Sequence, residues 1–156
     1  MGMKNGLYLP QFDFDSCGVG FVANLKGVKS HKIVSDAITM LENMEHRGAT
    51  GYEKSTGDGA GIQIQIPHEF LYEKALENGF YLPDVGDYGL GMLFFPKDDA
   101  LRDECKRVIY NSAEKLNYKI LGYRSVPVNN FEIGETAKSV EPVMEMIFIE
   151  KPFDVN

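Results

Sequence analysis

Two kinds of apolar periodicity alternate along this chain, and together they limit the folds open to it. Between residues 31 and 45, apolar side chains recur every three or four positions, which is typical of an amphipathic helix. Residues 62–66 instead alternate isoleucine with glutamine, as half-buried strands do. Because both periods occur within 156 residues, the length of one ordinary domain, we expect helices layered on a sheet.

The same patterns predict the other elements. A helix capped by Asp98 or Asp99 and running to about residue 117 carries Cys105 on its apolar face, where we expect it to be part of the core. The whole order, β-α-β-α-β-α-β-β, indicates an α+β or α/β domain. Strands are predicted at residues 17–23, 61–66, 88–95, 117–126 and 143–149, and the other two helices at residues 31–45 and 69–78.

Charge and composition exclude several classes of protein. The chain has 16 basic and 23 acidic side chains, a net charge of −7, and no basic stripe, so nucleic acid is not an expected partner. No apolar run approaches the ~20 residues of a membrane helix, and the first residues lack a secretory signal. With only two cysteines in addition, we expect a cytoplasmic protein with no membrane partner.

Two residues are candidates for chemistry, although each alone has a commoner structural explanation. Cys17 stands beside glycine, which leaves its thiol approachable, but a lone cysteine is more often a small core residue. Arg47 follows the helix at residues 31–45, and its guanidinium can hold a carboxylate through two parallel hydrogen bonds. A cation near a helix C-terminus is also favourable without any ligand.

Two other motifs give no indication of a functional site. The segment GDGAG at residues 57–61 lacks the spacing of a phosphate-binding loop and precedes a predicted strand, so we expect a tight turn with close backbone packing. His31 and His68 have no cysteine or histidine at zinc-ligand spacing, and no metal site is predicted.

Taken together, four short segments resemble one family. They are CGVGF (residues 17–21), LENMEHRGA (41–49), GDGAGI (57–62) and QIPHEF (65–70). Their residues and order are similar to those of the class II glutamine amidotransferases, and in particular to the opening of the glutaminase domain found in glutamate synthase large subunits. The resemblance is densest between residues 17 and 70 and extends over most of the chain.

The resemblance implies a fold, a reaction and two site residues. The fold is an αββα sandwich of the N-terminal-nucleophile hydrolase type, incomplete in this chain. Residues 1–16 are a leader whose removal makes Cys17 the N-terminal nucleophile, and residues 17–156 are the first part of the domain. Cys17 hydrolyses glutamine to glutamate and ammonia, and Arg47 binds the α-carboxylate of the substrate. No cofactor is expected in this chain.

For the complete enzyme the resemblance implies more partners. Ammonia passes to the remaining glutamate synthase domains and is added to 2-oxoglutarate with the help of FMN and an iron–sulfur cluster, and a small electron-donating subunit is a candidate partner. The chain contains no Asn-Gly-Glu segment to supply the family's oxyanion donors. We therefore expect a fragment that is inactive by itself. The alternative is a non-catalytic regulatory or assembly domain with the same fold.

Overall fold

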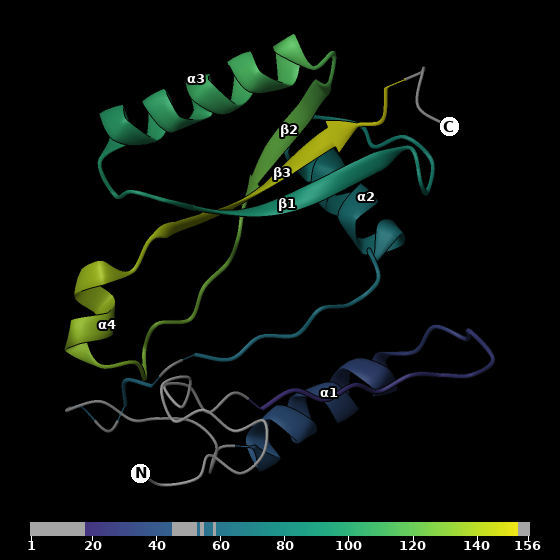
Figure 1. The fold of residues 1–156 in the computed structure, drawn as a ribbon, viewed down its shortest axis with the longest axis vertical. Coiled ribbons are helices and arrows are strands. Elements are labelled where there is room, and N and C mark those ends of the chain that lie inside the picture. Colours follow the sequence, from purple (N-terminus) through teal and green to yellow (C-terminus); the bar gives the residue numbers. More distant parts are fainter. Residues whose placement is uncertain (1–17, 45–52, 54, 58, 153–156) are drawn as a thin grey trace, which may run out of the picture. The chain divides into compact units, whose positions relative to one another are not determined.

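The computed structural model describes residues 18–44, 53, 55–57 and 59–152, and the chain divides into two compact units, Met1–Ile64 and Gln65–Asn156 (Figure 1). The first unit contains α1 (His31–Asn43). The second contains α2, β1, α3, β2, α4 and β3 in that order. The protein is therefore a mixed α+β structure, as the sequence predicts. No helix in the described ranges is long and apolar enough to cross a membrane.

A three-stranded antiparallel sheet forms the centre of the second unit. Its strands are β1 (Tyr88–Phe95), β2 (Lys119–Ser125) and β3 (Val143–Glu150), in the spatial order β1-β3-β2. The central strand, β3, pairs with β1 along its whole length and with β2 across a bulge between Ile120 and Gly122. Successive side chains of β3 point to opposite faces, so Ile147 and Phe148, only 3% and 0% exposed, bury both faces of the sheet.

One face of the sheet is covered by α2 (His68–Glu77) and the chain that follows it. Leu71 and Ala75 of α2 pack with Tyr88 and Phe148 in the core of the unit. The turn after the helix passes through Gly79 at a φ of +82° and brings the Phe80 ring within 5.3 Å of the Phe148 ring, centroid to centroid. The glycine supplies a left-handed conformation that other residues adopt only with strain.

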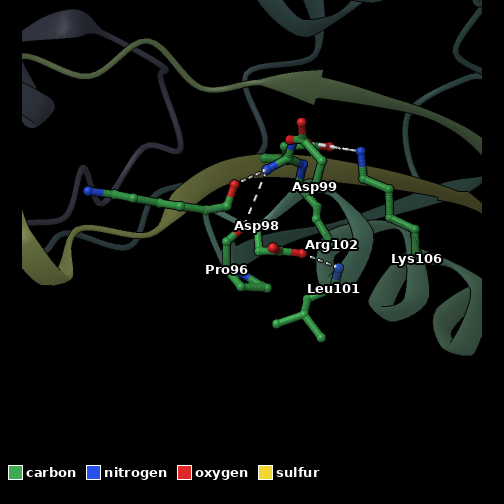
Figure 2. Close-up of polar contacts among 8 residues, drawn as sticks. Pro96, Asp98, Asp99, Leu101, Arg102 and Lys106 are labelled. Atoms are coloured by element: carbon green, nitrogen blue, oxygen red, sulfur yellow. Dashed lines mark hydrogen bonds and ion pairs between the residues drawn. The ribbon is translucent and has the colours of Figure 1, made fainter.

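The opposite face is covered by α3 (Asp99–Lys115), whose start is fastened to the end of β1. The Asp98 carboxylate accepts a hydrogen bond from the Leu101 amide at 2.9 Å, which confirms Asp98 as the cap. Arg102 donates to the carbonyl oxygens of Pro96 at 3.3 Å and Lys97 at 3.2 Å and pairs with Asp99 (Figure 2). These contacts hold the short connection between β1 and α3 against the first turn of the helix.

A largely buried ion pair joins α3 to the sheet. The Lys106 ammonium lies 2.7 Å from the Glu145 carboxylate, which is 7% exposed in the middle of β3. The same ammonium lies 5.6 Å from the Phe95 ring centroid and 4.9 Å from that of Tyr123, so both rings contribute cation–π attraction. Burial, and then the Glu145 charge, raise the pKa of the Tyr123 hydroxyl. That hydroxyl has no hydrogen-bond partner within the described ranges.

Most predicted elements are confirmed, with bounds within a few residues. The two predicted strands that flank α1 are wrong: residues 18–23 and 61–66 are neither strand nor helix, and position 17 lies outside the described residues. Alternation along a segment indicates which side chains share a face, but a strand also requires a backbone partner. Ile62, Ile64 and Ile66 remain 39–48% exposed.

Two further expectations need correction. The helix α4 (Glu135–Val140) was not predicted, because six residues without apolar periodicity give no helical signal. On α3, Cys105 is only half-buried, while Leu101 and Val108 are 55% and 57% exposed. The buried residue of this helix is Ala113, at 9% exposed, and Lys106 joins the helix to the sheet through its ion pair with Glu145.

Two strand glycines give matched stability tests. A Cβ added at Gly122 would lie 2.5 Å from the Phe80 ring, whereas one added at Gly89 would meet nothing within 4 Å. We expect Gly122→Ala to lower the free energy of unfolding by ~1–3 kcal/mol through overpacking. Gly89→Ala should change it by no more than ~0.5 kcal/mol. Urea unfolding followed by circular dichroism measures both, and equal effects would contradict the packing of Phe80 on β2.

Candidate active site

A close backbone approach joins the segment after Cys17 to α1. Residues 18–23 run without regular structure, and Gly20 within them lies against Met40 of α1. A Cβ at Gly20 would lie 2.4 Å from the Met40 Sδ and 3.0 Å from its Cε. The missing side chain therefore lets the helix pack directly on the backbone of this segment. Position 20 lies three residues after Cys17 in the chain.

The helix α1 is the element that leads to Arg47. Its half-buried side includes Ile33, Ala37 and Met40, which recur at helical spacing. On its exposed side Lys32 and Asp36 form an ion pair at 2.6 Å, four residues apart. Ser30 occupies the N-cap position as predicted, although its side chain makes no capping hydrogen bond.

The C-terminal end of α1 is sharply defined. The amide of Met44 donates to the carbonyl oxygens of Met40 at 3.2 Å and Leu41 at 3.0 Å, so that the helix ends at Asn43, four residues before Arg47. Met40 thus takes part in the closing turn of the helix and in the contact with Gly20. One side chain links the segment after the candidate nucleophile to the helix that precedes the candidate carboxylate-binding residue.

The structure describes residues 57 and 59–61 of the glycine-rich segment. Upstream, the Thr56 hydroxyl donates to the Glu53 carboxylate at 2.8 Å, and the Thr56 amide donates to the Glu53 carbonyl oxygen at 3.0 Å. Gly59 has a φ of +87°, a left-handed conformation that glycine adopts without strain. A Cβ at Gly59 or Gly61 would meet no described atom within 4 Å, so the described part of the chain does not show the predicted close backbone packing.

Histidine and acidic side chains do not gather into a metal centre in the described ranges, where no three potential ligands come together. His31 lies 3.2 Å from the Ser35 hydroxyl of its own helix, measured from Nδ1 to Oγ. His68 lies at the start of α2 with its Nδ1 3.0 Å from the Tyr88 hydroxyl. Burial raises the pKa of that hydroxyl, and the pair links α2 to β1.

Cys17 and Arg47, the two predicted site residues, both lie outside the described residues. Both positions belong to the unit Met1–Ile64, which also contains Gly20 and Met40. Sequence reasoning missed Met40 as a residue of interest. Its position three residues after Ala37 and four before Met44 in the helical pattern was the available signal.

Comparison with known proteins assigns the family. The profile described as "Glutamine amidotransferases class-II" matches residues 17–156, so the match begins at Cys17. The NADH-dependent glutamate synthase of Saccharomyces cerevisiae is 43% identical over 146 residues, which cover 90% of this chain and 7% of that protein. The NADPH-dependent glutamate synthase large chain of Bacillus subtilis is 39% identical over all 156 residues, 10% of its own length.

A chloroplast glutamate synthase is similar to this chain to about the same degree. Ferredoxin-dependent glutamate synthase 2 of Arabidopsis thaliana is 43% identical over 134 residues, 86% of this chain and 8% of that protein. The chain thus spans about a tenth or less of the length of these relatives. The profile match over 17–156, together with these identities, shows that the chain belongs to the class II glutamine amidotransferases.

Proposed function

We propose that this chain provides the nucleophile and the substrate carboxylate clamp of the glutaminase domain of a glutamate synthase. Cys17 is the nucleophile, and Arg47 is the clamp. The observation that carries the proposal is the contact of Gly20 with Met40, which connects the segments leading to these two residues within one unit. The start of the family match at Cys17 supports a leader of residues 1–16 that is removed before catalysis.

Removal of the leader has a chemical purpose. While Ser16 is attached, the nitrogen of Cys17 is an amide and has no basic lone pair. Once cleaved, it is an α-amine with a pKa of ~7.7–8.0, which suits it to take the proton of a thiol with a pKa of ~8.5. An uncleaved chain lacks this base, and we expect the 156-residue polypeptide with its leader attached to be inactive.

The thiolate of Cys17 is the group that begins glutamine hydrolysis. Its sulfur attacks the side-chain amide carbon of glutamine, and the protonated amine returns its proton to the leaving nitrogen, which departs as ammonia. The resulting thioester is then attacked by water, which releases glutamate and restores the thiol. In this scheme Cys17 supplies both the nucleophile and the general base.

Arg47 is suited to hold the substrate. A planar guanidinium forms two parallel hydrogen bonds to a carboxylate, which fixes the direction of the glutamine as well as its position. In the sequence Arg47 follows the last residue of α1, Asn43, by four positions.

The proposal extends to the whole fold and the whole enzyme. For the complete domain we propose the αββα sandwich of the N-terminal-nucleophile hydrolases, of which this chain supplies only the first part. The ammonia is added to 2-oxoglutarate in the other glutamate synthase domains, which hold FMN and an iron–sulfur cluster and receive electrons from a further partner. The relatives are named for NADH, NADPH and ferredoxin, so the electron donor varies among them. We place the enzyme in the cytoplasm.

The first test concerns Cys17 and the leader. In the full-length gene product, N-terminal sequencing of the mature protein should begin at Cys17. Cys17→Ala should abolish ammonia release from glutamine, and Cys17→Ser should slow it by orders of magnitude, because an alkoxide forms less readily than a thiolate. A fully active protein that still begins at Met1 would contradict the proposal and favour a non-catalytic regulatory or assembly domain.

The second test separates the clamp from a helix cap. Losing a bidentate charged pair costs ~1.5–3 kcal/mol, so Arg47→Ala should lower kcat/KM for glutamine roughly 10- to 150-fold. Arg47→Lys keeps the charge without the fork and should fall between this variant and the wild type. If Arg47 only stabilises the end of α1, Arg47→Ala will lower Tm and leave glutamine kinetics unchanged.

A third test addresses the Gly20–Met40 contact. Gly20→Val places atoms where the end of the Met40 side chain lies and should lower kcat by less than ~10-fold, because a methionine side chain can turn aside. Met40→Ala removes the obstructing side chain, and the double variant should recover most of the lost rate. Single Met40→Ala is the control for the helix. No recovery in the double variant would mean that Gly20 serves something other than this packing.

A further inference from the structure

The side chain of Arg124, on β2, lies between a ring and a sulfur and has no anionic partner among the described residues. Its Nη1 donates to the Met146 Sδ at 3.8 Å, and its Cζ lies 5.7 Å from the centroid of the Phe70 ring on α2. A thioether sulfur is a weak acceptor. No described oxygen accepts a hydrogen bond from this guanidinium, so its five N–H donors lack a strong acceptor although the side chain is half-buried.

The other two arginines that the structure describes both pair with carboxylates. Arg102 pairs with Asp99, and Arg107 pairs with Glu104 at 3.1 Å. The chain has 23 acidic and 16 basic side chains, so Arg124 is not left unpaired for want of acids. A charge that is partly withdrawn from water without a partner is unfavourable. Of the described arginines, Arg124 is thus the one whose guanidinium is open to a further group.

The neighbours of Arg124 add positive charge and apolar surface. Lys74 of α2 also lies over the Phe70 ring, 5.9 Å from its centroid, so two cations border one aromatic side chain. Glu77 lies 2.7 Å from the Lys74 ammonium and offsets its charge in part, and the other glutamates of α2 form no ion pair with Arg124. Phe70 itself is 48% exposed, so its ring offers apolar surface beside the open donors.

We infer that Arg124 binds a carboxylate group, through the two parallel hydrogen bonds that a guanidinium forms with it. The carbon atoms next to that carboxylate lie on Phe70 and Met146, which favours an organic carboxylate over inorganic phosphate. Two sources offer this chemistry. One is a free dicarboxylate, and the other is an aspartate or glutamate side chain of the polypeptide outside the described residues. Experiment distinguishes them.

Arginine labelling tests for a free carboxylate. Phenylglyoxal adds to guanidinium groups, and peptide mass spectrometry of the full-length gene product gives the labelling rate of each arginine. Glutarate, which has a carboxylate at each end of an apolar stem, should slow the labelling of Arg124 roughly tenfold at about ten times its dissociation constant. Arg107 is the control, because its carboxylate partner is already in place, and its labelling should not change. Glutaramide, the uncharged diamide of glutarate, should slow neither.

Cross-linking tests for a carboxylate of the polypeptide. Arg124→Lys places an amine at this position, and a water-soluble carbodiimide joins an amine to a carboxylate in contact with it through an amide bond. Mass spectrometry of the full-length variant then identifies the partner peptide. The control is Arg107→Lys, which should couple to Glu104. If the polypeptide supplies the carboxylate, Arg124→Lys should couple to one acidic residue from outside the described ranges.

Protection of Arg124 by glutarate would identify a free ligand, and a single cross-linked peptide would identify the polypeptide as the source. Equal protection by glutarate and by glutaramide or inorganic phosphate would overturn the assignment to an organic carboxylate. Failure of both measurements, with neither protection nor a cross-link, would also overturn it. Arg124 would then be a side chain that only packs on Phe70.

Discussion

The burial of β3 on both faces is the constraint on which the second unit depends. Ile147 and Phe148 are neighbours in the chain and point to opposite faces, and each is almost fully buried. A single strand therefore requires two covering layers, and α2 and α3 supply them. Both strands that flank β3 in the sheet lie earlier in the chain than β3 itself. The sheet is thus assembled from contacts distant in sequence.

The polar cluster under α3 belongs to the same constraint. Glu145 lies two residues before Ile147 on the same face, and burying its carboxylate would be costly without a partner. Lys106 reaches it from α3 along the Phe95 and Tyr123 rings, so the apolar stem of the lysine covers the sheet while its charge satisfies the carboxylate. The helix is thereby held in one position over the strands, at the expense of a conventional apolar interface.

Glycines play three different structural parts in this chain. Gly20 and Gly122 admit a neighbouring side chain against the backbone, Met40 in one unit and Phe80 in the other. Gly59 and Gly79 supply left-handed turns. Gly89 leaves the surface of β1 open, because a Cβ there would meet no described atom within 4 Å. Only the first kind bears on the proposed chemistry, because Gly20 connects the segment after Cys17 to the helix before Arg47.

The family itself was predictable from short segments of sequence, because catalytic chemistry demands particular residues at particular spacings. The segment CGVGF and the pair Arg47-Gly48 have such residues at such a spacing, and they indicated the family. The profile match beginning at Cys17 confirms the family assignment. The positions of Cys17 and Arg47 as site residues remain predictions. Met40 escaped notice because it reads as one more apolar residue of a helix, and only its packing on Gly20 distinguishes it.

The helices α1, α2 and α3 and the strands β1, β2 and β3 were predictable from sequence alone, since their periodicity, caps and turn residues act locally. Asp98 at the start of α3 and Gly79 after α2 are examples. Which segments pair as strands, and which side chains are buried, was decided by the tertiary structure. Residues 61–66 alternate like a strand and yet are not one, and α3 buries Ala113 and Lys106 against the sheet while Val108 stays exposed. The physical reason is that a pattern selects a face, whereas pairing and burial depend on which partner the rest of the chain brings to it.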